Sequence, residues 1–198
     1  MSIVWIARVS DVQNATYNER VAVEQPYFHE RVTRETLPNI KTLLEAARRC
    51  GVEPIYTVIE SLTLDGRDRS LDYKLSGFNI AKGSWEAKVV EAVAPAGDEI
   101  VLPKTSSSLF NSTTFDYVLR NIGIDTILVA GFLTDQCVDH TVRDGADRSY
   151  LMICVEDACA TQTAQRHAGA LAAFKGYCRI AHTREIADEL DLLQGRPR

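Results

Sequence analysis

The sequence lacks a long apolar segment, since no stretch approaches the roughly 20 apolar residues that a membrane-spanning helix needs. Its first residues, Met1 to Arg8, have neither the basic start nor the apolar core of a signal peptide. A long basic run is also absent and the formal net charge is -5, which leaves no electrostatic footprint for nucleic acid or for an anionic membrane surface. We therefore expect a soluble, cytoplasmic protein whose partners include no nucleic acid and no membrane.

Cysteine is scarce and is not arranged for cross-linking. The five cysteines are an odd number and none has C-x-x-C spacing, which argues against a disulfide framework and against a structural zinc site. At 198 residues with 45% hydrophobic content, residues 1–198 are expected to form a single domain. Four of the cysteines are interpreted as small buried residues: Cys50, Cys154, Cys159 and Cys178.

Apolar runs alternate with amphipathic stretches along the chain, which indicates an α/β fold built from right-handed βαβ units. Strands are expected at residues 3–7, 54–59, 100–103, 126–130, 151–155 and 179–181. Helices are expected at residues 35–50, 115–122, 135–148, 164–177 and 184–193. Residues 61–96 are polar and are expected to form a long excursion with little strand content, and long loops inside compact domains are usually functional.

The segment 126–138 places a cysteine between a buried strand and a helix. Residues 127–130 form the continuous apolar run of a parallel strand, and Gly131 allows a sharp exit from it. Thr134 is the expected N-cap of the next helix. Cys137 then lies in the first helical turn, where free N–H groups and the helix dipole favour a thiolate over a thiol. The alternative for Cys137 alone is an inert buried thiol.

Two charged side chains follow other predicted strands. Asp11 comes after the first strand and Lys104 after the third, and in an open parallel sheet ligands bind beyond the carboxyl ends of the strands. With Cys137 they would supply a base and a cation to a nucleophilic thiol. Taken alone, Asp11 also fits a turn or N-cap aspartate and Lys104 a solvated lysine. His140 is a weaker candidate for the base, because neighbours on one helix seldom place a base on the attacking side of a thiol.

Four groups of residues carry a family resemblance. They are Asp-Val-Gln-Asn at 11–14, Lys104 with Phe110, Gly-Phe-Leu-Thr-Asp-Gln-Cys-Val at 131–138 with Thr141 and Arg143-Asp144, and Asp-Ala-Cys-Ala-Thr at 157–161. In these motifs the chain resembles the cysteine hydrolases of the isochorismatase-like superfamily, which include carbamoylsarcosine, ureidoacrylate and biuret hydrolases and nicotinamidases. The resemblance implies a homo-oligomer and a three-layer α/β/α sandwich with a central, mostly parallel, six-stranded Rossmann-like sheet. Arg8 and Ser10 depart from the pattern, because the family usually keeps an apolar strand there.

By this resemblance, Asp11, Lys104 and Cys137 form a catalytic triad and the peptide bond between Phe132 and Leu133 is cis. That bond would help aim the backbone N–H groups of Leu133 and Cys137 at one point, the oxyanion hole. Nicotinamidase-like members bind a metal through an Asp-x-His pair after the second strand, where this chain has Glu-Ser-Leu at residues 60–62. We therefore expect no metal and no cofactor, and we disfavour a nicotinamidase.

The expected function is cysteine-dependent hydrolysis of a C–N bond in a small amide, ureide or carbamoyl compound, through a thioester or thiocarbamate. The alternatives are vinyl ether hydrolysis as in true isochorismatases, which do not use the cysteine, and a catalytically silent binding or assembly protein on the same scaffold. If Arg67 or Arg69 faces the pocket, its guanidinium would suit a substrate carboxylate, and the alternative for residues 65–70 is a solvated turn. Asn111 and Gln136 would suit an amide or ureido group. The full set of substrate-binding candidates is Glu60, Arg67, Arg69, Tyr73, Lys74, Ser108, Asn111 and Gln136.

Overall fold

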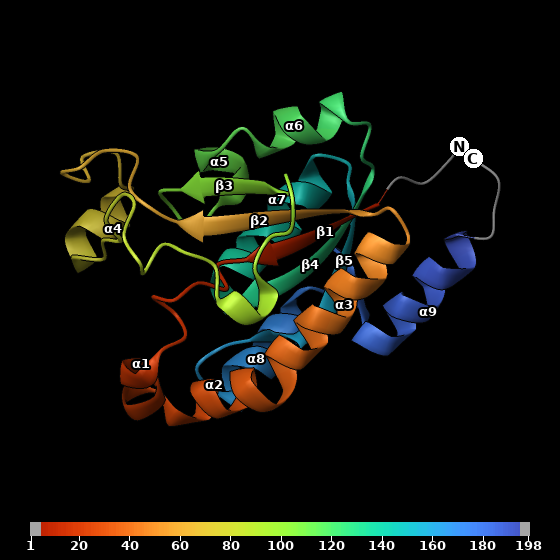
Figure 1. Ribbon diagram of the computed structural model, residues 1–198, viewed down its shortest axis with the longest axis horizontal. Coiled ribbons are helices and arrows are strands. Elements are labelled where there is room, and N and C mark those ends of the chain that lie inside the picture. Colours follow the sequence, from red (N-terminus) through yellow and green to blue (C-terminus); the bar gives the residue numbers. More distant parts are fainter. Residues whose placement is uncertain (1–4, 195–198) are drawn as a thin grey trace.

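The computed structural model describes residues 5–194 and places a six-stranded sheet at the centre of the protein (Figure 1). The strands are β1 (Trp5–Ser10), β2 (Glu53–Ile59), β3 (Ile100–Lys104), β4 (Thr126–Phe132), β5 (Leu151–Ala160) and β6 (Arg179–Ala181). They lie in the order β3-β2-β1-β4-β5-β6, and every neighbouring pair is parallel.

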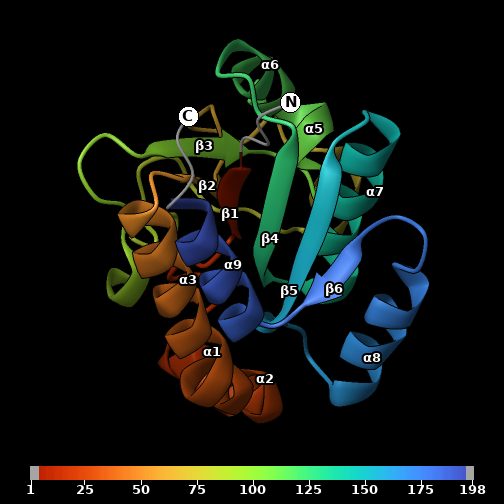
Figure 2. The same cartoon turned by 90° about the vertical axis from the view of Figure 1, so that its right-hand side faces the viewer.

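Helices cover both faces of this sheet. They are α1 (Glu19–Glu24), α2 (Pro26–Arg31), α3 (Leu37–Arg49), α4 (Leu71–Ser76), α5 (Leu109–Ser112), α6 (Phe115–Asn121), α7 (Asp139–Asp147), α8 (Ala164–Ala173) and α9 (Thr183–Gln194). The shorter elements are the π-helical turns η1 (Val32–Thr36) and η3 (Thr134–Val138) and the 3-10 turn η2 (Glu91–Val93). Figure 2 shows α3 and α9 on one face and α5 to α8 on the other, so the predicted three-layer α/β sandwich is confirmed. Within residues 5–194, none of the helices combines the length and the apolar character that crossing a bilayer requires.

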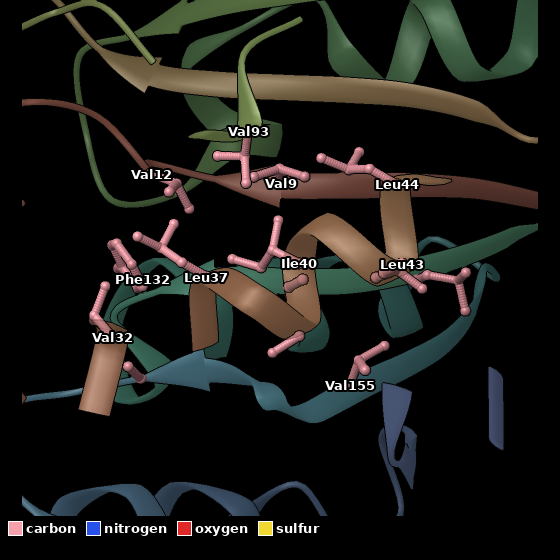
Figure 3. Close-up of a cluster of buried hydrophobic side chains, with 14 of the residues drawn as sticks. Val9, Val12, Val32, Leu37, Ile40, Leu43, Leu44, Val93, Phe132 and Val155 are labelled. Carbon is pink, nitrogen blue, oxygen red and sulfur yellow. The ribbon is translucent and has the colours of Figure 1, made fainter. Parts of the chain in front are cut away.

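One apolar stripe fixes α3 against the sheet. Leu37, Ile40, Leu43 and Leu44 recur at helical spacing and are between 0% and 8% exposed. Figure 3 shows them facing β1, β4 and β5, where Val9 belongs to the same cluster. Burying one such side chain stabilises the fold by about 1.5 to 3 kcal/mol. This packing fixes α3 on the face of β1 and β4, the two strands that lead into the site.

Several strands continue past the ends that the apolar runs predict. β1 extends through Ser10, β4 through Phe132 and β5 through Ala160, whereas the predicted strands end at residues 7, 130 and 155. An apolar run stops at the first polar residue, but Arg8 and Ser10 are fully buried and keep their places in the parallel ladder. The first strand was also predicted to include residues 3 and 4, which lie outside the described residues.

Two helix starts also differ from the prediction. Helical structure runs from α2 through η1 into α3 without a break, because Pro26 opens it well before residue 35. The helix predicted from residue 135 begins as the π-helical turn η3, and its N-cap is Leu133. Thr134 is therefore not the cap: its hydroxyl lies 2.9 Å from Nδ1 of His167 instead.

The excursion of residues 61–96 holds α4 and η2 and contributes no strand to the central sheet, in agreement with the prediction. Its α4 lies beyond the carboxyl ends of the strands, toward the left of Figure 1, whereas η2 packs against α3. The chain order of the strands reverses at β1, which lies between β2 and β4. In open parallel sheets this reversal leaves a crevice where ligands bind.

Candidate active site

Asp11 is the first residue after β1 and is 1% exposed. Its φ is 51°, in the left-handed region that aspartate tolerates better than most residues. Its N–H donates to the carbonyl of Thr57 at 2.9 Å, which ties the turn to β2. Backbone strain of this kind costs about 1 to 3 kcal/mol and is concentrated at functional sites.

Lys104 is the last residue of β3 and is fully buried. Its Nζ lies 3.1 Å from Oδ2 of Asp11, and it donates to Sγ of Cys137 at 3.2 Å and to the carbonyl of Ser106 at 2.9 Å. An ammonium carries three hydrogens, and these contacts provide one acceptor for each. Lys104 therefore joins the carboxylate after β1 to the thiol after β4.

Cys137 lies in η3 and is 5% exposed. The peptide bond between Phe132 and Leu133, where β4 leads into this turn, is cis. The carbonyl of Phe132 accepts a hydrogen bond from the hydroxyl of Ser10 at 3.1 Å. The ends of β1 and β4 are thus linked directly beside the thiol.

Burial and the negative charge of Asp11 together raise the pKa of the Cys137 thiol to about 11, although Lys104 opposes the shift. Burial and Asp11 therefore oppose the thiolate that the first helical turn was expected to favour. Burial acts to lower the pKa of Lys104, but the negative charges of Asp11 and Cys137 outweigh burial and raise it. The ammonium stays charged.

A buried polar layer that the sequence interpretation did not select lies under these groups. Nη2 of Arg8 donates to the hydroxyl of Ser10 at 3.0 Å and to that of Thr57 at 3.1 Å. Each hydroxyl in turn donates to one carboxylate oxygen of Asp11 at 3.1 Å. Burial lowers the pKa of Arg8 and the charge of Asp11 opposes this, and a guanidinium remains protonated in proteins. The available signal was polar residues inside an otherwise apolar first strand.

Side chains from the excursion cover the thiol. Tyr73, Ile80 and Ala87 pack with Ile59 of β2 in one buried cluster with Cys137. Burial raises the pKa of the Tyr73 phenol to about 12, so it is neutral and can donate a hydrogen bond. A pocket of about 720 Å³ adjoins this cover and is lined by Asp72, Tyr73, Ser76, Gly77, Phe78, Ser107 and Gln136.

Of the candidate binding residues, Tyr73 and Gln136 line this pocket and the others do not. Ser108 instead caps α5 and donates its hydroxyl to Asp144 at 2.5 Å. Glu60 accepts the N–H of Gly83 at 2.6 Å, at the start of the excursion. Both of these side chains are engaged in holding the loops around the site.

The two candidate arginines have partners within their own loop. Arg67 is exposed and pairs with Asp65 at 3.1 Å. Arg69 donates to the carbonyl of Gly66 at 2.9 Å and to that of Phe78 at 2.8 Å. Neither arginine lines the pocket formed by Tyr73 and Gln136.

Lys74 and Asn111 are exposed and do not line that pocket. Asn111 accepts a hydrogen bond from Arg148 at 3.5 Å. His140 is exposed and its Nδ1 lies 3.0 Å from the carbonyl of Gln136. The ring of His140 is thus held by the backbone of its own helix.

The remaining cysteines are free thiols. Cys154 and Cys159 are fully buried, with their sulfurs 4.0 Å apart, as their interpretation as core residues expects. Cys50 and Cys178 are half-buried rather than buried, because they lie where α3 ends and before β6 begins.

Comparisons with known proteins extend over most of the chain. An isochorismatase domain model matches residues 8–186. Ureidoacrylate amidohydrolase RutB of Rhizobium rhizogenes is 32% identical over 170 residues, which cover 76% of this chain and 68% of that protein. A cysteine hydrolase from Pseudomonas syringae pv. phaseolicola superposes with a TM-score of 0.86 at 26% identity, over 96% of this chain and 93% of that chain. An N-carbamoylsarcosine amidase from Thermoplasma acidophilum superposes with a TM-score of 0.74 at 25% identity, over 91% of this chain and 97% of that chain.

The arrangement of the parallel sheet and its helical layers is that of isochorismatase-like hydrolases. Since the domain model spans almost all of the described residues, this chain belongs to the isochorismatase family. It is a hydrolase of that family.

Proposed function

We propose that this protein hydrolyses the C–N bond of a small amide or ureide with Cys137 as the nucleophile. One observation carries the proposal: the Nζ of Lys104 lies 3.1 Å from Asp11 and 3.2 Å from the sulfur of Cys137, with all three side chains buried. A thiol, a base and a fixed cation in contact are the parts that covalent catalysis on a carbonyl requires. Similarity to proteins named for ureidoacrylate and N-carbamoylsarcosine supports the same class of substrate.

The first half of the reaction forms a covalent intermediate. Asp11 takes the proton of the Cys137 thiol as the sulfur attacks the substrate carbonyl carbon. The N–H groups of Leu133 and Cys137 donate to the oxyanion that forms. Asp11 then gives its proton to the leaving nitrogen, the C–N bond breaks, and ammonia or an amine departs from a thioester or thiocarbamate.

The second half returns the site to its starting state. Asp11 takes a proton from a water molecule, whose oxygen attacks the same carbonyl carbon. The C–S bond then breaks, the acid or carbamate leaves, and the proton on Asp11 returns to the sulfur of Cys137. Lys104 stays charged throughout, because its ammonium holds the carboxylate and donates to the sulfur.

The charges around the pocket favour a neutral substrate. Among its described lining residues there is one carboxylate, Asp72, and no cation. Arg67 and Arg69 are engaged elsewhere, so neither offers its guanidinium fork to a substrate carboxylate. The amide of Gln136 and the phenol of Tyr73 present donors and acceptors suited to an amide or ureido group.

The test is ammonia release from a panel of ureides, carbamoyl amino acids, biuret and simple amides, with native protein and the Cys137→Ser variant. We expect turnover of at least one neutral compound and a loss of about 10³-fold or more in the variant, because serine is not deprotonated by a carboxylate. Cys50→Ser is the matched control, since it changes a half-buried free thiol far from the triad, and it should retain native activity. Full activity of Cys137→Ser would overturn the proposal.

A vinyl ether substrate added to this test, with its cleavage products measured directly, separates the first alternative. A vinyl ether hydrolase would cleave it equally well in native protein and in Cys137→Ser. A catalytically silent binding protein would turn over no compound, and its Cys137 would react with iodoacetamide no faster than the buried Cys154. Mass spectrometry of a stalled reaction adds a direct measure, because the proposed intermediate increases the mass of the peptide that contains Cys137.

A further inference from the structure

Arg8 occupies an unusual place for an arginine. It lies inside β1, three residues before Asp11, and is fully buried. Its Nη2 contacts two hydroxyls, while Nε and Nη1 have no hydrogen-bond partner within residues 5–194. Burying a cation with unpaired N–H groups costs stability. The fold alone would therefore be better served by an apolar side chain at this position.

The two hydroxyls connect Arg8 to both oxygens of Asp11. A guanidinium only donates hydrogen bonds, so Nη2 occupies an acceptor site on Ser10 and on Thr57. The hydrogen of Thr57 is thereby directed to Oδ1 of Asp11 at 3.1 Å. The hydrogen of Ser10 faces Oδ2 of Asp11 and the carbonyl of Phe132, each at 3.1 Å. The donor-only character of Arg8 thus directs the Thr57 hydrogen to Asp11 and leaves the single Ser10 hydrogen shared between Asp11 and the carbonyl of Phe132.

We propose that Arg8 is a positioning residue: through Ser10 and Thr57 it directs hydroxyl hydrogens onto Asp11 and so keeps this carboxylate ionised and in one orientation for the proton of Cys137. The inference rests on the proposed function, in which Asp11 must be ionised to accept that proton. A protonated Asp11 cannot act as the base, so the arrangement around its two oxygens matters for the reaction. Arg8 supplies a positive charge that favours the ionised carboxylate, and Lys104 supplies a second one 3.1 Å from Oδ2 of Asp11.

The ionisable groups around Arg8 come from several elements. Asp11 follows β1, Lys104 ends β3, Cys137 lies in η3 and Cys159 belongs to β5. Asp11 is the one carboxylate among these groups, and it faces the two cations Arg8 and Lys104. Removing one of the two should let Asp11 take up a proton at a higher pH.

The experiment compares the pH profiles of kcat and kcat/KM for the native enzyme, Arg8→Met, Arg8→Lys and Thr57→Val. The acid limb of kcat/KM reports protonation of the base in the free enzyme. We expect Arg8→Met to move this limb upward by about one pH unit or more, and to lower the plateau kcat about tenfold with KM changed less than about threefold. Arg8→Lys keeps the charge and should restore most of the limb. Thr57→Val removes one connecting hydroxyl at nearly constant volume and should give a smaller upward shift.

Ile6→Val controls for a change in the packing of the same face of β1, and it should leave the pH profile unchanged. If Arg8→Met and Thr57→Val fold and keep the native acid limb, the inference is overturned and Arg8 is structural only. If Arg8→Met does not fold, Thr57→Val alone provides the test. An unshifted acid limb in its pH profile of kcat/KM would then overturn the inference. Failure of the proposed function is distinguishable, because it would appear as full turnover in Cys137→Ser.

Discussion

Gly131 determines how closely β4 approaches β1 beside the site. It pairs with Ser10 in the parallel ladder, immediately before Asp11 on one strand and the cis peptide on the other. Its φ is 112°, and a Cβ built there would lie 2.2 Å from the carbonyl oxygen of Ser10 and 2.7 Å from its nitrogen. Both contacts are with backbone, which cannot rotate away as a side chain would. Gly131→Ala therefore forces the two strands apart.

The cost of Gly131→Ala has two parts. Holding alanine at a left-handed φ costs about 1 to 2 kcal/mol. Relieving an overlap with main chain moves Ser10 and breaks or stretches neighbouring ladder hydrogen bonds, each worth about 1 kcal/mol, and it opens the buried layer under Asp11. We expect a loss of about 4 kcal/mol or more in the free energy of unfolding, a large share of the 5 to 15 kcal/mol of an ordinary domain.

Alanine variants of two other glycines separate the backbone strain from the overlap with main chain. The free energy of unfolding is measured by urea unfolding followed by circular dichroism. Gly123 has a φ of 75° and nothing within 4 Å of a built Cβ, so Gly123→Ala should lose about 1 kcal/mol from backbone strain alone. Gly169 lies inside α8 with open space around it, and Gly169→Ala should gain about 0.5 to 1 kcal/mol. If the losses in the free energy of unfolding of Gly131→Ala and Gly123→Ala differ by less than about 1 kcal/mol, the close approach of the two strands does not limit the residue at position 131.

Three further predictions concern charge. Lys104→Met should abolish turnover and lower the free energy of unfolding by about 3 kcal/mol at pH 7, because it leaves the buried carboxylate of Asp11 without its ion-pair partner. Urea unfolding measures this loss, and a loss below about 1 kcal/mol would contradict the prediction. Burial lowers the pKa of His167 to about 4, so the unfolded chain binds its proton first and stability falls as pH drops from about 6.5 to 4. His167→Gln should reduce this fall by about 2 kcal/mol, and an unchanged pH profile of unfolding would refute it. Asp72→Asn should raise kcat/KM about threefold for a ureide that carries a carboxylate and leave a neutral ureide unaffected, whereas equal effects on both would argue against the charge preference of the pocket.

The strand order and layers follow from features that a sequence displays directly. A run such as residues 127–130 is apolar on both faces, and such runs form parallel strands covered on both sides. The ends of the strands were harder to predict from the sequence. Arg8 and Ser10 are polar and would be solvated in an isolated strand, and they are buried only because β2 and β4 provide partners on either side. Burial of that kind depends on residues distant in sequence, so an apolar run underestimates the strand.

In the candidate site, too, some residues could be predicted from the sequence and others could not. Asp11, Lys104 and Cys137 were predicted because each follows a strand, and the structure brings the three side chains together. Arg67 and Arg69 were selected by charge in a polar loop, yet local acceptors engage both guanidinium groups. Sequence position indicates which strand end a residue occupies, but it does not indicate whether a nearer partner already satisfies its side chain.

The raised pKa of Cys137 explains why the base must touch the thiol. A helix terminus favours an anion by about 0.3 to 1 kcal/mol, whereas a pKa raised from 9.0 to about 11 corresponds to about 3 kcal/mol against the thiolate. Burial therefore outweighs the dipole on which the sequence interpretation relied. A thiol that is not ionised at rest becomes a nucleophile only as its proton leaves, which requires an ionised acceptor in contact with it. The buried carboxylate of Asp11 meets that requirement only while cations oppose its own protonation, and Lys104 and Arg8 approach it from different strands. Covering the thiol with Tyr73 and Ile80 is compatible with this chemistry, because the same exclusion of water that suppresses a free thiolate strengthens the hydrogen bonds that accompany proton transfer.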